Sequence, residues 1–347
     1  MVIDTKLINS TEALRSAQEI LTADCQDLRS SLYRDLVVNA LKCKRDELDT
    51  LDLKVISRAL TEFRHAARAF KPYRHIRKVS MFGSARVTPD SAIYQSAAEF
   101  GQLAAQEGFM VITGGADGIM RAGIEGAGAQ NSFGVNIALP FEKDINRIIQ
   151  NDPKSINFKY FFTRKIFFVM EADAIALFPG GFGTHDEGFE VLTLLQTGKA
   201  PLMPVVLIEP AGENYWESWD LFIRSQLLTR HLISKEDLSF YYIANSPEKA
   251  RNYIKFYYST YHSMRQVRDT LVIRLEKELA RYQIKKLNCD FADIIQSGEI
   301  QKTPPLAGEA SEPDLLEKPR ISFVYNRKKA GRLNEMILAI NRLGEES

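Results

Sequence analysis

Short apolar runs alternate with helical patterns over the central part of the chain. The apolar runs are VSMF (79–82), FMVIT (109–113), GVNIAL (134–139), AIALF (174–178) and PVVLI (204–208). The spacing of apolar residues between them predicts helices near 91–107, 118–129, 163–171 and 185–197. This alternation is typical of an α/β fold in which helices cover both faces of a parallel sheet. Ligands of such sheets bind at the carboxyl ends of the strands.

A helical pattern also fills the N-terminal part of the chain, over residues 10–71. The expected N-cap of its last helix is Asp52, and Pro72 ends that helix. The apolar stripe of the helix consists of Leu53, Ile56, Leu60, Phe63 and Phe70. We interpret residues 1–75 as a helical N-terminal extension whose stripe packs against the main domain.

The segment after the last apolar run has a mixed pattern. Residues 216–228 and 246–282 have helical spacing, and we expect helices there. Residues 298–320 contain four prolines and many polar side chains, which predicts a flexible linker. Residues 321–343 fit one strand and one helix. The chain is thus expected to divide into a helical extension (1–75), a nucleotide-binding domain (76–260) and a C-terminal helical extension, linker and small terminal segment (261–347).

Composition restricts the classes of partner. The 347 residues, 45% of them hydrophobic, are enough to bury a sizeable core. Lys and Arg number 45 against 44 Asp and Glu, so the net charge is +1 and no global field favours nucleic acid or an anionic membrane. Recognition of an anion must therefore be local.

Neither a metal site nor a disulfide framework is expected. Cys25, Cys43 and Cys289 show no paired spacing, and the five histidines do not cluster in sequence. The N-terminal residues MVIDTKLINS lack an apolar signal-peptide core, and no run of eighteen apolar residues occurs. We therefore expect a soluble, cytoplasmic protein with reduced thiols and no metal.

The strongest chemical signal is LFPGGFGTHDEGFE at residues 177–190. Gly180, Gly181 and Gly183 allow backbone N–H groups to approach a ligand, and Thr184 supplies a hydroxyl where the next helix is expected to start. The alternative is a capping box between Thr184 and Glu187, which needs no ligand. Three glycines in four positions exceed what a cap requires, so we favour an anion site.

Other turns at the carboxyl ends of the predicted strands are weaker signals. FGSAR (82–86) contains Ser84, TGGADG (113–118) contains Gly115, and ALPFE (138–142) follows the third run. The glycines of TGGADG do not complete a dinucleotide motif, because Pro140 stands where an acidic residue would hold a ribose hydroxyl. No glycine run precedes Lys-Ser or Lys-Thr, which excludes a P-loop. FGSAR fits either an ordinary tight turn or a ligand contact.

A carboxylate beside a phosphate requires nearby cations. Arg164 and Lys165 precede the AIALF run and are candidates, although a solvated helix charge is the alternative for Arg164. An adjacent Arg164 is expected to lower the pKa of Glu187 and keep it ionised. A phosphate pocket that contains a carboxylate suits cleavage of a phosphorylated sugar, because the carboxylate stabilises positive charge at the anomeric carbon.

Together these motifs resemble the LOG (Lonely Guy) family, often called lysine decarboxylase-like. The resemblance covers residues 78–258 and rests on Pro-Gly-Gly-Phe-Gly-Thr-His-Asp-Glu at 179–187, on Arg164–Lys165, and on FGSAR, GGADGIM and FKYFFTRK. It implies a Rossmann-like fold, a homodimer or larger homo-oligomer, and no cofactor. The implied reaction is hydrolysis of the N-glycosidic bond of a nucleoside 5′-monophosphate, AMP or a cytokinin nucleotide, to free base and ribose 5-phosphate.

The resemblance also assigns roles to residues of this chain. Arg164 and Glu187 are implied to be the catalytic pair. The implied phosphate and nucleotide contacts are Gly180, Gly181, Gly183, Thr184, Ser84, Gly115 and Lys165. The name lysine decarboxylase has no support in the sequence, because no pyridoxal phosphate site with a Schiff-base lysine is identifiable.

The chain departs from long members of the family at three positions. It has Ala116, Asp117 and Arg121 where they commonly have Gly, Pro and Glu. If Arg121 faces the pocket, a more anionic ligand is favoured; if it faces solvent, nothing changes. The main alternative to an enzyme is a nucleotide or phosphorylated-cofactor carrier or sensor, similar to molybdenum cofactor carriers. A scaffold whose terminal helices bind a protein partner is a third interpretation.

Overall fold

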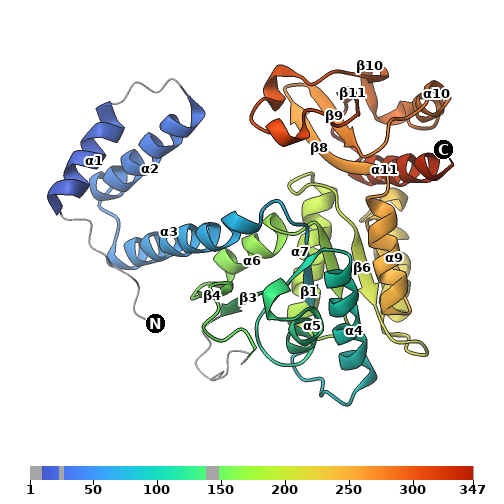
Figure 1. Cartoon of the computed structure of the whole chain (residues 1–347), viewed down its shortest axis with the longest axis horizontal. Coiled ribbons are helices and arrows are strands. Elements are labelled where there is room, and N and C mark those ends of the chain that lie inside the picture. The colour runs from blue at the N-terminus through green and yellow to red at the C-terminus, as the bar shows by residue number, and fades with distance from the viewer. Residues whose placement is uncertain (1–9, 23–26, 138–147, 347) are drawn as a thin grey trace. The chain divides into compact units, whose positions relative to one another are not determined.

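The fold is described from a computed structural model, which covers residues 10–22, 27–137 and 148–346. The Cα positions form two compact units, Met1–Thr61 and Glu62–Ser347. The first unit contains α1 (Ser10–Thr22), α2 (Leu28–Arg45) and the first part of α3 (Thr50–Phe70) (Figure 1). None of the described helices is both long and apolar enough to cross a membrane.

Helix α3 matches the predicted helix but not its predicted cap. Asp49 Oδ1 accepts the backbone N–H of Asp52 at 2.9 Å, so the side chain that caps the helix is Asp49 and the prediction of Asp52 is wrong. The helix ends at Phe70, and Pro72 lies in the 3₁₀ turn that follows. Phe70 and Phe133 both belong to the second unit, where Phe70 is buried and stacks on Phe133, whereas Leu60 is exposed.

The second unit is built on a seven-stranded parallel sheet in the order β4-β3-β2-β1-β5-β6-β7. Its strands are β1 (Lys78–Phe82), β2 (Met110–Thr113), β3 (Ser132–Ile137), β4 (Ser155–Phe158), β5 (Ala174–Leu177), β6 (Val205–Ile208) and β7 (Tyr241–Ala244). The predicted Rossmann-like α/β fold is confirmed. The sequence pattern missed the edge strands β4 and β7, because each has four residues and several are only half-buried, so neither reads as an apolar run.

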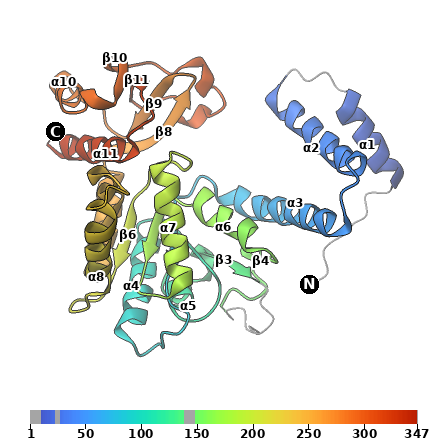
Figure 2. The same ribbon diagram turned by 180° about the vertical axis from the view of Figure 1, so that it is seen from behind.

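Helices cover both faces of this sheet, as Figures 1 and 2 show from opposite sides. One face packs against α4 (Ala92–Gln106), α5 (Ile119–Ala127) and α9 (Pro247–Tyr257). The other face packs against α6 (Phe161–Met170), α7 (Phe182–Gln196), α8 (Tyr215–Phe222) and the end of α3. Alternate residues of the central strands therefore enter two separate cores: Val79 and Ala174 lie in the first, Ile112 and Ile175 in the second.

The order in which successive strands are added to the parallel sheet reverses between β1 and β5. Strands β2 to β4 extend to one side of β1, and β5 to β7 extend to the other. At the carboxyl ends of β1 and β5 the two following loops join, because Phe178 N donates to Phe82 O at 2.8 Å and Ser84 N donates to Pro179 O at 3.2 Å. A reversal of this kind leaves a crevice outside the strand ends, and it is where open α/β sheets bind ligands.

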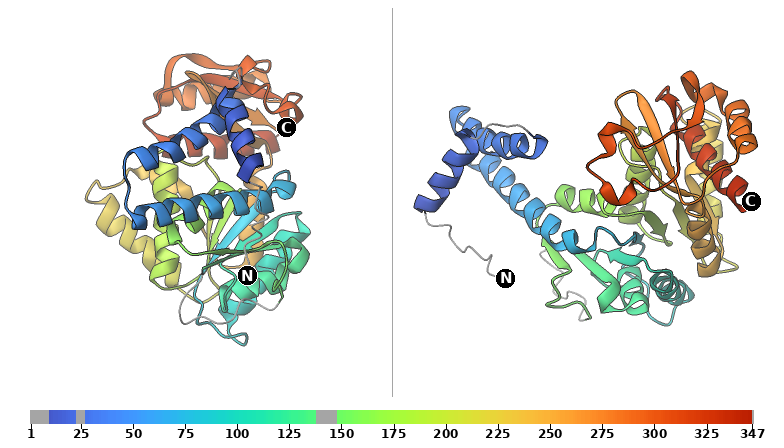
Figure 3. Two further views of the ribbon diagram at one scale, coloured as in Figure 1. Left: turned by 90° about the vertical axis from the view of Figure 1, so that its left-hand side faces the viewer. Right: turned by 45° about the horizontal axis from the view of Figure 1, so that its top comes forward.

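A second sheet follows α9 and corrects two predictions. It is antiparallel, in the order β10-β11-β9-β8, with β8 (Tyr261–Val267), β9 (Thr270–Leu275), β10 (Ile295–Lys302) and β11 (Arg320–Tyr325) (Figures 1 and 3). Residues 261–275 were predicted as helix but form the hairpin β8–β9. Helices α10 (Arg281–Asp290) and α11 (Ala330–Glu345) accompany the sheet, and the strand and helix predicted within 321–343 are confirmed.

The prediction of a flexible linker over 298–320 is wrong. Part of this segment is β10, and the buried carboxylate of Glu309 lies 2.8 Å from both Arg274 and Arg320. Glu309 and Arg320 therefore anchor the segment to the second sheet, although most other side chains of the segment are exposed. Short helical turns complete the chain at Lys71–Tyr73, Ala129–Asn131, Ile223–Leu228, Lys235–Phe240, Ala292–Ile294, Ala307–Glu309 and Pro313–Leu315.

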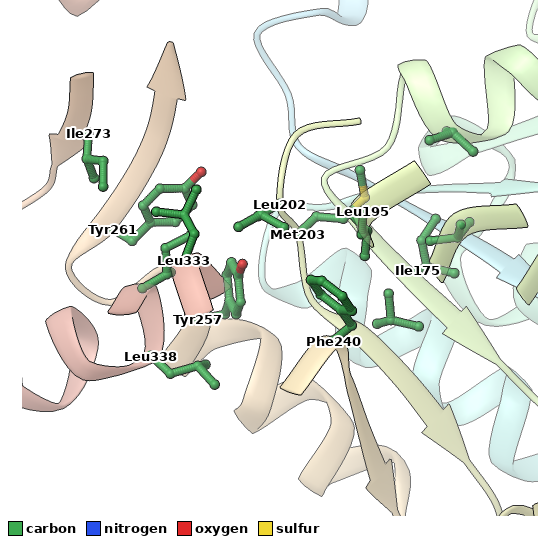
Figure 4. Packing of buried hydrophobic residues seen from close by; sticks show 14 of the residues in the cluster. Ile175, Leu195, Leu202, Met203, Phe240, Tyr257, Tyr261, Ile273, Leu333 and Leu338 are labelled. Carbon is green, nitrogen blue, oxygen red and sulfur yellow. The ribbon is translucent and has the colours of Figure 1, made fainter. Parts of the chain in front are cut away.

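The two sheets of the second unit share one hydrophobic core. Figure 4 shows Tyr257, Tyr261 and Leu333 on the side of the C-terminal elements, and Leu202 and Phe240 on the side of the parallel sheet. Buried hydrogen bonds add to this packing, since Tyr257 donates to Asn334 and the backbone N–H of Tyr261 donates to Asn341. The boundaries at 75/76 and 260/261 stay predictions.

Candidate active site

A cavity of about 830 Å³ lies at the carboxyl ends of β1, β2 and β5. Its walls come from the turns after these strands, from the first part of α7 and from α6. All of the predicted site residues except Lys165 line it, namely Ser84, Gly115, Arg164, Gly180, Gly181, Gly183, Thr184 and Glu187. The fold thus brings together residues more than 100 positions apart in sequence. Their chemical roles stay predictions.

Helix α7 begins at Phe182, three residues before its predicted start. Its N-cap is Gly181, which has no side chain that can cap, so Thr184 and Glu187 both lie inside the helix. The capping-box interpretation of their spacing is therefore wrong, and the spacing instead puts both residues on one face of α7. The N–H groups of Thr184 and His185 donate to Gly181 O at 3.0 and 3.2 Å, which leaves those of Phe182 and Gly183 as the first N–H groups of α7. Both residues line the cavity, and free N–H groups at the start of a helix are the arrangement that binds anions.

The three glycines of this loop serve two different purposes. A Cβ on Gly180 would lie 2.1 Å from Thr184 Oγ1 and 2.9 Å from Ser84 N, so the packing of the two loops requires glycine there. Beside Gly181 and Gly183, no heavy atom of the described residues lies within 4 Å of a Cβ. Packing does not require glycine at these two positions, and both leave space in which a ligand can approach the backbone.

Gly115 and Ser84 line the cavity as well. Gly115 has φ of +71°, and a Cβ there would lie 1.7 Å from Asn136 Oδ1, so both conformation and packing require glycine. Its N–H group donates to Thr113 Oγ1 at 3.1 Å and is already satisfied. Ser84 Oγ accepts the N–H of Arg86 at 3.1 Å, which leaves the hydroxyl proton of Ser84 for another acceptor.

Glu187 is the buried acid of the cavity, with 6% of its surface exposed. Its Oε2 atom has no hydrogen-bond partner among the described residues. Burial raises the pKa of Glu187 to about 7, although Lys165 and Arg164 each act to lower it. The prediction that Arg164 keeps this carboxyl ionised is therefore wrong in its net result: the sign of the arginine's effect is as expected, but the loss of hydration outweighs it.

Arg164 and Lys165 are neighbours on α6 but have different surroundings. The guanidinium of Arg164 lies over the rings of Phe161 and Phe168, at 5.0 and 5.5 Å from their centroids, and faces the cavity. Lys165 Nζ lies 2.8 Å from a carboxylate oxygen of Asp186 and 2.8 Å from one of Glu190, and 3.9 Å from Glu187. Lys165 thus interacts with three acids of α7. These interactions connect α6 to α7 outside the cavity.

A buried carboxylate fixes the start of α6. Glu62, at 4% exposure, accepts the backbone N–H of Lys159 at 2.8 Å and the hydroxyl of Thr163 at 2.6 Å. These bonds hold the turn that leads into the helix of Arg164 and Lys165. No local pattern in the sequence indicated this contact, because Glu62 lies 97 and 101 residues from its partners.

Arg121, the departure from the family pattern, does not line the cavity. Its side chain is 45% exposed and forms an ion pair with Glu125 one turn along α5, at 2.8 Å. Of the two alternatives, the structure therefore supports the one in which this substitution leaves the charge of the cavity unchanged. Ala116 does line the cavity.

Several lining residues were not among the predicted site residues. They include Arg86, Met120, Asn136, Phe161, Phe168, Phe182, His185 and Asp186. Arg86 belongs to the FGSAR turn, so its position after a strand was a usable signal. Asn136 is buried within β3, where its amide donates to Ser155 and Asn157, and an apolar strand pattern gave no sign of it.

Two further predictions concern metal ligands and the third strand end. Among residues 10–22, 27–137 and 148–346, no group of three His, Cys, Asp or Glu side chains is placed to hold a metal ion. The ALPFE turn at 138–142 lies outside the described residues.

The geometry can be compared with known proteins. A family model described as "Possible lysine decarboxylase" matches residues 107–254, which include α6, the glycine loop and α7. An uncharacterized protein of Archaeoglobus fulgidus is 32% identical over 122 residues, which are 35% of this chain and 77% of that protein. The chain belongs to this lysine decarboxylase-like, or LOG, family. Membership fixes neither the substrate nor the reaction.

Two solved structures of molybdenum cofactor proteins are similar to about half of the chain. The molybdenum cofactor binding protein of Rippkaea orientalis is 25% identical, with a TM-score of 0.35, and aligns over 52% of this chain and 94% of its own. The molybdenum cofactor carrier protein of Chlamydomonas reinhardtii is 19% identical, also with a TM-score of 0.35, over 52% and 96%. TM-scores this low carry no argument about the function of this LOG family member.

Proposed function

We propose that this protein hydrolyses the N-glycosidic bond of a nucleoside 5′-monophosphate, AMP or a cytokinin nucleotide, to free base and ribose 5-phosphate. The observation that carries the proposal is the position of Glu187. This buried acid has an oxygen without a hydrogen-bond partner in the described part of the chain, and it stands on the helix whose first N–H groups border the cavity. An anion site and an acid are thereby combined on one rigid element.

The phosphate of the substrate would bind at the start of α7. Gly181, Gly183 and Thr184 would supply N–H groups and a hydroxyl, and the helix dipole favours the negative charge. Arg164 would add a fixed cation from α6. A helix rises about 9 Å over the six residues from Gly181 to Glu187, which leaves room for a pentose between the phosphate and the carboxyl.

Glu187 would then act at the anomeric carbon. As the bond to the base breaks, the base leaves with the bonding electrons and takes up a proton, while water forms the new bond to carbon. Positive charge develops on the sugar in between, and an ionised Glu187 lowers its energy or accepts a proton from the water. A pKa of about 7 suits an acid that alternates between these forms at neutral pH.

Decarboxylation with pyridoxal phosphate, which the family name suggests, fits these residues poorly. Such an enzyme needs a lysine amine inside the cavity to form a Schiff base. No lysine lines the cavity within the described ranges, and the amine of Lys165 is held by Asp186 and Glu190. We therefore derive no step through that cofactor.

The deciding experiment measures release of base and ribose 5-phosphate from a panel of nucleoside monophosphates. Wild type, Glu187→Gln and Glu190→Gln are assayed together. Glu190 also binds Lys165 but does not line the cavity, so Glu190→Gln is the matched control. We expect Glu187→Gln to bind the nucleotide and lose at least about a hundredfold in turnover, as loss of a positioned acid does, while Glu190→Gln keeps most activity.

The outcomes separate the candidate functions. Unchanged turnover in Glu187→Gln would remove the catalytic role of this residue. Tight nucleotide binding without any release of base by wild type would favour a carrier or sensor. Neither binding nor release would leave a scaffold as the better hypothesis.

A further inference from the structure

We propose that Tyr215, outside the cavity, is a positioning residue that fixes the direction of an anion-binding N–H group in the glycine loop. Its hydroxyl donates to the carbonyl oxygen of Gly180 at 2.5 Å. Tyr215 stands on α8 and does not line the cavity, so it acts through the loop. The consequence for phosphate binding rests on the proposed function, whereas the effect on the loop does not.

The argument starts from the geometry of a single peptide group. No cis peptide bond occurs in the described ranges, so the carbonyl of Gly180 and the N–H of Gly181 point in opposite directions. The carbonyl of Gly180 points to Tyr215, which lies outside the cavity, so the N–H of Gly181 points away from Tyr215. Because Gly181 lines the cavity, we infer that its N–H points into the cavity.

Glycines on both sides make this peptide group easy to turn over. Gly180 and Gly181 lack the Cβ atoms that restrict rotation, and nothing within 4 Å opposes a Cβ at Gly181. A flip of the peptide would direct the Gly180 carbonyl oxygen into the cavity, where it would repel an anion. The preceding carbonyl, of Pro179, is already held by Ser84 N at 3.2 Å. Tyr215 supplies the corresponding bond for the next peptide.

His185 completes the arrangement and fixes the proton of the tyrosine. Its Nε2 lies 2.7 Å from the Tyr215 hydroxyl oxygen. A carbonyl oxygen only accepts, so the single hydroxyl proton must go to Gly180, and His185 Nε2 must be the donor to Tyr215. Burial lowers the pKa of His185, which keeps the ring neutral with its proton on Nε2 at neutral pH.

The tyrosine itself is held by the start of α8. Its ring packs edge-on against Trp216, with centroids 4.8 Å apart. Trp216 is buried, and its backbone N–H and indole N–H donate to Glu209 and to the carbonyl of Ile208, at 2.8 and 3.2 Å. The position of Tyr215 is therefore set by contacts with α8 and the end of β6.

The test compares Tyr215→Phe with Tyr241→Phe. Both variants remove one hydroxyl next to α8, but Tyr241 bonds to Asp220 of that helix and has no contact with the loop. In the ligand-free protein, we expect amide hydrogen exchange of residues 178–187 to accelerate several-fold in Tyr215→Phe and to stay unchanged in Tyr241→Phe. Equal exchange in wild type and Tyr215→Phe would overturn the proposal, whatever the protein binds.

Ligand binding gives the second readout. By calorimetry, Tyr215→Phe should weaken AMP and ribose 5-phosphate by roughly tenfold, the effect of one hydrogen bond to an anion, and leave adenosine unchanged. An equal loss for adenosine would indicate general damage to the site and contradict the positioning role. If wild type binds none of these compounds, the proposed function fails, and the exchange experiment still decides the role of Tyr215.

Discussion

At the scale of single residues, Glu187 couples pH to both stability and activity. Its pKa in the folded protein is about 7, above the ordinary 4.5 that it regains on unfolding. Between these values the folded state binds more protons than the unfolded chain, so the free energy of unfolding falls as pH rises. Above about pH 7 the free energy of unfolding has decreased by its full amount, roughly 3 kcal/mol.

Glu187→Gln should abolish this decrease of the free energy of unfolding with pH, because glutamine does not titrate. Relative to that of wild type, the free energy of unfolding of the variant should increase by up to about 3 kcal/mol as the pH rises from about 5 to about 8, as measured by urea unfolding. If the ionised carboxylate is the active form, kcat/KM of wild type should rise through about pH 7. The residual activity of Glu187→Gln should follow only the titration of the substrate phosphate, near pH 6. Parallel stability curves for the two proteins would contradict the buried titration.

At the scale of elements, substitutions at the start of α7 are expected to affect protein stability and ligand binding differently. Gly181→Ala and Gly183→Ala place a methyl group in open space, so both proteins should fold, and Gly183→Ala should be more stable by about 0.5–1 kcal/mol because Gly183 is helical. The same methyl groups narrow the cavity, so affinity for AMP should fall in both. Thermal unfolding and calorimetry measure the two effects.

Gly180→Ala is the matched contrast, since its Cβ would meet Thr184 and Ser84 N. We expect this variant to lose stability as well as binding, by about 1–3 kcal/mol, the usual cost of overpacking. If all three alanine variants bound AMP as wild type does, the glycine loop would not be the anion site.

At the scale of the whole molecule, the two compact units predict different outcomes of truncation. Residues 62–347 contain both sheets, their shared core and the cavity, so this fragment should fold with a cooperative thermal transition. Residues 1–260 lack the second sheet and α11, and they would expose Tyr257, Leu202 and Phe240. We expect that fragment to aggregate. Circular dichroism and size-exclusion chromatography would test both, and a soluble, folded 1–260 fragment would contradict the shared core.

Local patterns in the sequence predicted much of the parallel sheet and of the site. Apolar runs marked β1, β2, β3, β5 and β6, because central parallel strands are buried on both faces. Glycines and polar residues marked the turns at the ends of β1, β2 and β5, because ligands of such sheets bind there. The motif resemblance then named nine site residues, and all of them except Lys165 line the cavity.

The hairpin β8–β9 shows where local patterns fail. Its strands meet at Arg268–Asp269, which lacks the glycine that marks most two-residue turns, and Arg268 adopts φ of +53°. The charged residues of this segment also fit a helix surface. The segment forms strands because β9 pairs with β11 and its side chains are buried against the core. Both interactions involve residues far away in sequence.

The sequence by itself determined the fold class, through the alternation of apolar runs and helical patterns, and its motifs identified the family and the residue types of the site. Tertiary structure alone decided their chemistry. It buried Glu187 and so raised its pKa, bound Lys165 to the acids of α7, turned Arg121 away from the cavity and brought Tyr215 behind the glycine loop. The physical reason is that hydration, electrostatic coupling and hydrogen-bond direction depend on distances in space, which spacing in a sequence does not contain.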